Sequence, residues 1–167
     1  MSHRTRAARP ADAGAIARIY NEGIEERLAT FETRPRSAEE VAGWFSAGFP
    51  LVVVESEGAV VAWASAPPYR PGREAYEGIG EFSVYVARPA RRQGAGRAAM
   101  EALAREAETR GLWQLVSRIF PENEASLALC RSLGFREVGV YRRHARLDGE
   151  WHDVVVVELL LGEAADA

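Results

Sequence analysis

A glycine- and arginine-rich segment past the middle of the chain has the residue types of an anion-binding turn. It runs from Arg91 to Gly96, between an expected strand and an expected long helix. Glycines allow a tight turn whose N–H groups point outward, and the start of a helix adds the positive end of its dipole. Further charge comes from Arg88, Arg92 and Arg97. The segment predicts a pyrophosphate site; the alternative is a glycine-rich loop beside solvated arginines.

The same turn also matches a dinucleotide-binding fingerprint, as Gly94-x-Gly96-x-x-Ala99. That fingerprint normally occupies the first strand–helix unit, with an acidic ribose ligand roughly 20 residues further on. Here it lies past mid-chain, and the acidic candidates are Glu108 inside the helix and Glu122 after a proline. Both points disfavour a dinucleotide-binding fold.

Composition excludes several other kinds of chemistry. All 21 basic residues are Arg, so a Schiff base on a lysine and a lysine-dependent phosphate loop are excluded. A net charge of −3 argues against a nucleic-acid partner. Cys130 is the single cysteine, and His3, His144 and His152 are scattered. Neither an internal disulfide nor a metal site is therefore expected.

The length and the apolar pattern predict one α+β domain around a central sheet. The chain has 167 residues, 47% of them hydrophobic, and no repeats or linkers. No apolar run approaches the roughly 20 residues that cross a bilayer, and no signal-peptide core is present. We therefore expect a cytoplasmic protein without a membrane partner. The domain is expected to cover residues 1–161, followed by a flexible tail over 162–167.

Periodicity and turn residues place the elements. The expected strands are 4–9, 51–54, 60–64, 82–86, 114–120, 135–140 and 154–161. The expected helices are 12–20, 37–45, 94–110 and 124–133. Asn21-Glu22-Gly23 is expected to break the first helix, and Ser37 with Glu40 forms a capping box at the second. Pro67 to Gly80 is expected to be a long ordered loop or a loop with short strands.

These segments together resemble the GNAT superfamily of N-acetyltransferases. The resemblance is carried by Ser83–Val86, Arg91-x-x-Gly94-x-Gly96, Asn123 and Leu133-Gly134-Phe135. Four further segments are similar to the phosphinothricin acetyltransferase subgroup, with its arsinothricin-resistance members: Ile19–Asn21, Thr30–Thr33, Glu81–Val86 and Trp151–Val154. The resemblance implies a GNAT fold. Its central sheet is mixed, mostly antiparallel and twisted, is flanked by helices, and has strands that splay at the acetyl-CoA site.

The resemblance implies acetyl-CoA as the cosubstrate and assigns its contacts. Val84 and Val86 would offer backbone groups to the pantetheine arm, which Asn123 and Ser126 would also contact. The pyrophosphate would be held by Arg91, Arg92, Gly94, Ala95, Gly96 and Arg97. The alternative for Asn123 is a residue that caps its own helix.

Glu81 matches the position of the subgroup's proposed general base. An amine attacks a thioester only when it is neutral, so transfer needs a proton acceptor. Glu81 immediately precedes the strand implied to line the cofactor and would accept the proton directly or through a water. The alternative is a salt-bridged carboxylate at a strand end. His144 and His152 are the remaining candidate bases.

The acceptor pocket is implied to consist of Phe31, Tyr85 and the loop with Arg70, Arg73 and Tyr76. Arginine binds oxyanions through two parallel hydrogen bonds, which suits an acceptor with two anionic groups. Arg70 aligns less cleanly with the subgroup than Arg73, and solvated surface arginines are the alternative. The resemblance also implies a homodimer with this loop near the partner.

Cys130 stands where many family members have Tyr and the phosphinothricin enzymes have His. A thiol is a poor proton donor to the leaving thiolate unless its pKa is tuned. An acetyl-cysteine intermediate is the chemical alternative, but we expect Cys130 to pack as a small apolar residue. Tyr141 or water could then protonate the thiolate.

The leading hypothesis is an acetyl-CoA-dependent N-acetyltransferase that gives antibiotic resistance. It would acetylate the α-amino group of a small glutamate-like antimetabolite of the phosphinothricin or arsinothricin type. One alternative keeps the cosubstrate and changes the acceptor to methionine sulfoximine or sulfone, another amino acid or a polyamine. The other is a non-catalytic acyl-CoA-binding sensor.

Overall fold

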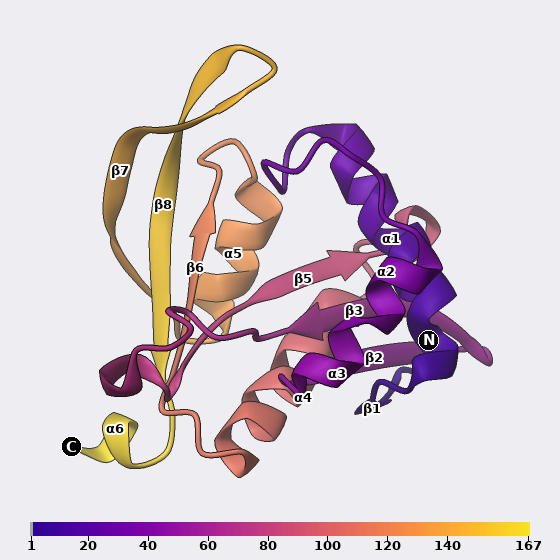
Figure 1. Ribbon diagram of the computed structural model, residues 1–167, viewed down its shortest axis with the longest axis horizontal. Coiled ribbons are helices and arrows are strands. Elements are labelled where there is room, and N and C mark those ends of the chain that lie inside the picture. Colours follow the sequence, from indigo (N-terminus) through magenta and orange to yellow (C-terminus); the bar gives the residue numbers. More distant parts are fainter. Residues whose placement is uncertain (1) are drawn as a thin grey trace.

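The computed structural model describes residues 2–167, which form two four-stranded sheets (Figure 1). The first has the order β1 (Arg4–Ala7), β2 (Leu51–Ser56), β3 (Ala59–Ser65), β5 (Ser83–Val86). The second has the order β4 (Ile79–Glu81), β6 (Gln114–Ile119), β8 (Glu150–Leu160), β7 (Arg136–Leu147). Of the pairings between named strands, β4 with β6 is parallel and the others are antiparallel. The mixed, mostly antiparallel α+β architecture predicted from the sequence is confirmed.

Helices cover both faces of the first sheet: α1 (Ala13–Glu26) and α2 (Ala38–Ala42) on one, α4 (Ala95–Thr109) on the other. The remaining helices are α3 (Trp44–Ala47), α5 (Glu124–Ser132) and, after β8, α6 (Glu163–Asp166). Short 3₁₀ turns occur at Pro10–Asp12 (η1), Glu74–Tyr76 (η2) and Arg88–Ala90 (η3). None of the helices formed by residues 2–167 has the length and apolar character to cross a membrane.

Side chains of β2 alternate between the two faces of the first sheet, so the strand contributes to two hydrophobic clusters. Val52 and Val54 pack with α4, whereas Val53 packs with α1 and α2 on the other face. Successive side chains of a strand point to opposite faces, so a strand covered on both sides is apolar throughout. The run Leu51–Val54 therefore marks a central strand that both helical layers bury.

The two sheets separate where the chain passes from β4 to β5. Phe82 still donates its N–H to Val116 of β6 at 2.9 Å, and Ser117 donates its hydroxyl to the Phe82 carbonyl at 3.0 Å. From Ser83 onward, β5 pairs with β3 instead. The sequence-based expectation of splayed strands is confirmed, and the gap opens immediately after Phe82.

The expected break in the first helix is wrong, because α1 continues through Asn21 and Gly23 to Glu26. Gly23 is required for space: a β-carbon there would lie 2.7 Å from two ring carbons of Tyr85. A glycine in the middle of a helix can mark a close contact as well as a stop. Asn21 instead uses its side chain to hold a neighbouring loop.

The C-terminal hairpin is longer than expected. β7 runs to Leu147 and β8 starts at Glu150, joined by Asp148 and Gly149 with φ values of 50° and 83°. Positive φ at both turn residues is the type I′ geometry that matches strand twist. The exposed outer half of β7 lacks an apolar alternation, so the sequence did not indicate it. Residues 163–166, expected in a flexible tail, form the short helix α6.

Candidate active site

Two cavities meet at β5 and at the start of α5. The Glu81 cavity, of about 550 Å³, also contains Phe31, Arg118 and His144 in its lining. The Gly94 cavity, of about 500 Å³, lies over the arginine- and glycine-rich turn. Both are lined by Ala29, Val84, Tyr85, Asn123 and Ser126. Volumes of this size suit small ligands, and shared walls allow two ligands to touch.

The turn at the Gly94 cavity has the backbone of an anion cradle. Arg92 and Gly94 both have positive φ, 61° and 88°, and α4 begins at the next residue, Ala95. The first amides of a helix have no acceptor within it and suit a negatively charged group. A β-carbon on Gly96 would lie 3.4 Å from Leu129 and 3.5 Å from Val86, so a large side chain there would fill this space. These residues fit a pyrophosphate.

Most of the expected cofactor contacts line the Gly94 cavity. They are Val84, Val86, Arg91, Arg92, Gly94, Gly96, Arg97, Asn123 and Ser126. Ala95 does not line it, because its side chain is buried in the core between α4 and the sheet. Any contact from Ala95 is restricted to its backbone.

Arg91 is held by α1 at the edge of this cavity. Its guanidinium donates to both carboxylate oxygens of Glu26 at 2.6 and 2.7 Å, and Nε donates to the Val86 carbonyl at 3.1 Å. This guanidinium lowers the pKa of the Glu26 carboxyl. A bound pyrophosphate would compete with Glu26 for Arg91.

The backbone of β5 faces the gap between the sheets. Ala87 donates its N–H to Val61 of β3 at 2.8 Å. Because directions alternate along a strand, the polar backbone groups of Val84 and Val86 point away from β3. Val86 confirms this direction by accepting from Arg91. An extended chain in the gap could pair with these groups as a further strand would.

Asn123 caps α5 and also lines both cavities. Its Oδ1 accepts from the Ser126 amide at 3.3 Å. The capping role weighed from the sequence is therefore present. It coexists with a position at which the side chain meets any ligand that crosses from one cavity to the other.

Glu81 forms the ion pair that the sequence analysis weighed as the alternative, with Arg118, a partner that the sequence did not indicate. Arg118 on β6 donates to Glu81 Oε1 from Nη2 at 2.6 Å and from Nε at 3.0 Å. Arg118 Nη1 lies 3.1 Å from His144 Nε2, and the His144 ring stacks on Tyr141. The pair arises because Glu81 is in register with Val116 across the parallel β4–β6 ladder. That register, and hence the contact, has no local sequence signal.

The three loop residues expected to complete the acceptor pocket lie elsewhere. Arg70, Arg73 and Tyr76 line neither of the two cavities. The guanidinium carbon of Arg70 lies 5.4 Å from the ring centroids of Tyr69 and Tyr76, and that of Arg73 lies 6.0 Å from Tyr76. The start of the loop is bonded to β4, and there Pro67 and Pro68 do line the Glu81 cavity. Within one chain, the expectation that these three residues line the pocket is not met.

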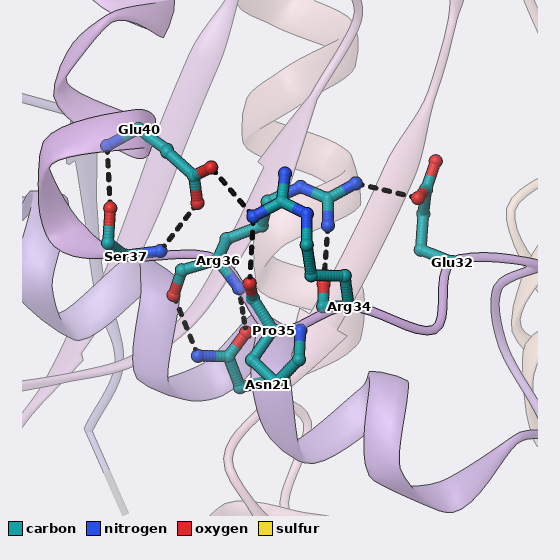
Figure 2. Close-up of polar contacts among 7 residues, drawn as sticks. All are labelled: Asn21, Glu32, Arg34, Pro35, Arg36, Ser37 and Glu40. Atoms are coloured by element: carbon teal, nitrogen blue, oxygen red, sulfur yellow. Dashed lines mark hydrogen bonds and ion pairs between the residues drawn. The ribbon is translucent and has the colours of Figure 1, made fainter.

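Phe31 and Tyr85 do line the Glu81 cavity, as expected. Figure 2 shows how the loop after α1 is fixed: Asn21 donates to the Arg36 carbonyl at 2.9 Å and accepts from its amide at 2.8 Å. Arg36 in turn pairs with Glu32 at 2.6 Å, next to Phe31. The loop is therefore held at both ends, which positions Phe31 over the cavity.

Cys130 and His152 are placed for packing. Cys130 is 3% exposed, and burial raises the pKa of its thiol to about 11. It lines the Glu81 cavity as a neutral thiol at pH 7. His152 stacks on Phe120, with ring centroids 5.1 Å apart, and lines neither cavity. Of the histidines considered as bases, His144 alone lines either cavity among the described residues.

Comparison with known proteins agrees with this geometry. The model of the acetyltransferase (GNAT) family matches residues 16–135. The chain is 35% identical over 159 residues to a phosphinothricin N-acetyltransferase of Alcaligenes faecalis, covering 92% of this chain and 80% of the relative. It is 33% identical over 172 residues to an L-methionine sulfoximine/L-methionine sulfone acetyltransferase of Pseudomonas paraeruginosa, covering 100% and 99%.

A solved acetyltransferase structure is also similar to this chain. The crystal structure of a phosphinothricin acetyltransferase from Sinorhizobium meliloti, in complex with acetyl-CoA, superposes with a TM-score of 0.91 at 34% identity. The match covers 100% of this chain and 92% of that one.

Proposed function

Since the chain belongs to the acetyltransferase (GNAT) family and is an acetyl-CoA-dependent N-acetyltransferase, we propose that its acceptor is the α-amino group of a small glutamate-like amino acid. Phosphinothricin and arsinothricin are the leading candidates, and acetylation would give resistance to them. The observation that carries the proposal is the meeting of the two cavities along β5. It sets a carboxylate, Glu81, beside the space between an acceptor and a thioester.

Glu81 has the role of proton acceptor in this proposal. It takes one proton from the acceptor's ammonium group, and the neutral amine then attacks the thioester carbonyl. An N–C bond forms, the C–S bond breaks, and the second amine proton ends on the sulfur of coenzyme A. Val84 and Val86 hold the pantetheine arm by their backbone, while the Arg91–Arg97 turn holds the pyrophosphate. Cys130 is not the nucleophile in this proposal, because its raised pKa leaves a neutral thiol at pH 7.

Methionine sulfoximine or sulfone is the second candidate acceptor. Among residues 2–167, Arg118 is the one arginine that lines the Glu81 cavity. The guanidinium of Arg118 can pair with the carboxylate of such an acceptor. Its sulfone or sulfoximine group is neutral and therefore needs no second cationic side chain. A relative that acts on these compounds is 33% identical over the whole chain.

Phosphinothricin has a second anionic group. It therefore requires a second cationic side chain, which the cavity of one chain does not supply. Arg70 and Arg73 are its natural partners, yet neither lines a cavity within one chain. The phosphinothricin proposal therefore goes together with a homodimer in which this loop reaches the partner's cavity. Size-exclusion chromatography with light scattering measures the oligomeric state. A monomer would favour methionine sulfoximine or sulfone as the acceptor.

An acceptor panel tests the proposed function. Release of free thiol from acetyl-CoA is followed with L-phosphinothricin, arsinothricin, L-methionine sulfoximine, L-methionine sulfone, spermidine and a simple aliphatic amine. A reaction without acceptor measures hydrolysis. We expect one of the four amino acids to be fastest. A faster rate with spermidine or the aliphatic amine than with all four amino acids would refute the acceptor class, and thiol release with none of the six compounds would refute the proposed acceptors.

A further inference from the structure

We propose that Arg118 binds the α-carboxylate of the acceptor and, by leaving Glu81 to do so, frees Glu81 to accept the acceptor's proton. The inference rests on the proposed function, because it requires an α-amino acid as the acceptor. It assigns a recognition role to a residue on β6 that the sequence did not single out. It also explains why a carboxylate suited to proton transfer is occupied in the absence of an acceptor.

The contact between the two residues obstructs the chemistry proposed for Glu81. Two N–H groups of Arg118 point at one carboxylate oxygen, Oε1, at 2.6 and 3.0 Å. The lone pairs of Oε1 accept these two hydrogen bonds. A proton that approaches Glu81 from the side of Arg118 must reach the same lone pairs. A carboxylate held in this way has a cation where the acceptor's ammonium group must come. Proton transfer to Oε1 therefore requires the guanidinium to move or to change partner.

The acceptor itself carries a group that can replace Glu81. Arginine binds a carboxylate through two parallel hydrogen bonds, and the α-carboxylate offers the same pair of oxygens as Glu81. Carboxylate and ammonium are attached to one carbon in an α-amino acid. Binding the carboxylate to Arg118 therefore carries the ammonium nitrogen to the side of Glu81. The exchange replaces one ion pair by two, acceptor carboxylate with Arg118 and acceptor ammonium with Glu81.

The ion pair between Arg118 and Glu81 is partly exposed to solvent, so exchanging its carboxylate has a low energetic cost. The side chains of Arg118 and Glu81 are 47% and 28% exposed, and both line the cavity. Ion pairs that water reaches contribute little to stability, so little is lost when one carboxylate replaces another. A buried pair would resist the change far more strongly.

His144 keeps the guanidinium in place when Glu81 is released. Arg118 Nη1 lies 3.1 Å from His144 Nε2. Because arginine has donors and no acceptor, the imidazole nitrogen accepts in this contact. The ring is steadied by stacking on Tyr141 at a centroid distance of 4.7 Å. Arg118 therefore has a second partner that does not depend on Glu81.

Paired acceptors that differ in the α-carboxylate alone test the proposal. One pair is L-methionine sulfone and 3-(methylsulfonyl)propan-1-amine. The other is L-phosphinothricin and (3-aminopropyl)methylphosphinic acid. For each pair, kcat/KM is measured with the wild-type protein, Arg118→Gln and Arg118→Lys. The matched control is Arg136→Gln, because Arg136 also donates through Nε and Nη2 to one oxygen of a glutamate, Glu158, but lines neither cavity.

We expect kcat/KM of the wild-type protein to be about 100-fold higher for the carboxylate-bearing member. That member gives Arg118 two charge-assisted hydrogen bonds, whereas the amine leaves the guanidinium without a partner carboxylate. Arg118→Gln should bring this ratio close to one, because kcat/KM falls far more for the carboxylate-bearing member than for the amine, and Arg118→Lys should give an intermediate ratio. Arg136→Gln should keep the wild-type ratio. An unchanged ratio in Arg118→Gln, or an equal loss for both members, overturns the inference.

A second arm does not depend on the Arg118 variants. In Glu81→Gln, both members of a pair lose the partner of their ammonium group, but Arg118 has no carboxylate to give up. The preference for the carboxylate-bearing member should therefore rise above the wild-type ratio while kcat falls. A ratio below that of the wild-type protein would contradict the exchange. Acetylation of amino acids with no preference over their amines refutes this inference alone. Acetylation of amines without any amino acid refutes the proposed function as well.

Discussion

Gly23 on α1 lies directly against the ring of Tyr85 on β5. A β-carbon at position 23 would stand 2.7 Å from two carbons of that ring. The ring cannot move away freely, because it stacks on Trp63 with centroids 5.0 Å apart and packs against Tyr20. Tyr85 lines both cavities, so helix α1 sets the position of the wall that the two ligands share.

Gly23→Ala should therefore destabilise the protein and lower kcat/KM. Overpacking a close contact costs roughly 1–3 kcal/mol, and any shift of Tyr85 narrows both cavities. Urea unfolding and the thiol-release assay measure the two effects. Gly14→Ala is the matched control in the same helix, because nothing lies within 4 Å of its added β-carbon. Equal stability of the two variants would show that Tyr85 adapts without cost.

Gly96→Trp should abolish acetyl-CoA binding, whereas Gly96→Ala should retain it. The added methyl of alanine meets Leu129 and Val86 at 3.4 and 3.5 Å, which the neighbours can accommodate with a small shift. An indole would fill the gap between α4 and β5. Isothermal titration calorimetry with acetyl-CoA separates the two. Unchanged affinity in a folded Gly96→Trp would remove the Gly94 cavity as the cosubstrate site. Gly94→Trp should also abolish binding, with added backbone strain at φ 88°.

The glycine turn was predictable because its signal is local, whereas the cofactor contacts were implied by the resemblance to the family and stay a prediction. Gly94 and Gly96 precede a helix, and Val84 and Val86 belong to one strand, so neighbouring residues fix their geometry. Glu81 with Arg118 is different: their contact depends on a parallel pairing of β4 with β6. Such pairing joins residues that are distant in sequence, and no local pattern encodes its register.

Two other differences from the sequence prediction have physical causes. The proline-rich loop carries arginines suited to an anion, but Arg70 and Arg73 lie near the rings of Tyr69 and Tyr76 and line neither cavity. Gly23 suggested a helix stop, since glycine lowers helix propensity. Contact with Tyr85 outweighs that cost, and this contact is tertiary.

Cys130→Ala should retain most of the turnover at pH 7. The pKa of about 11 leaves a neutral thiol, which is a poor nucleophile. Mass spectrometry after incubation with acetyl-CoA should show no acetyl group on Cys130. An acetylated Cys130, together with loss of turnover in the variant, would reverse this view.

Burial of Cys130 also predicts how stability depends on pH. The folded-state pKa, about 11, lies above the ordinary value of 9.0, so unfolding releases a proton between these values. The stabilising contribution is complete below pH 9 and is lost as the pH rises toward 11, with a slope of up to about 1.4 kcal/mol per pH unit. Urea unfolding over this range should show a shallower fall for Cys130→Ala. Identical slopes would contradict the assignment.

Glu81→Gln should lower kcat by about 10²–10⁴-fold, the usual range for loss of a general base. Acetyl-CoA affinity should stay unchanged, because Glu81 does not line the Gly94 cavity. Glu158→Gln is the control: that carboxylate also pairs with an arginine, at 2.7 Å, but lines neither cavity. Near wild-type turnover of Glu81→Gln would leave His144 as the base to test.

The central claim is that this chain moves an acetyl group from acetyl-CoA to the α-nitrogen of an amino acid. The most direct measurement uses acetyl-CoA labelled with ¹³C in the carbonyl and the fastest acceptor of the panel, with the product analysed by NMR and tandem mass spectrometry. We predict one α-N-acetyl product per free coenzyme A, formed by the wild-type protein and not by Gly96→Trp. Coenzyme A released without an acetylated α-nitrogen would contradict the account.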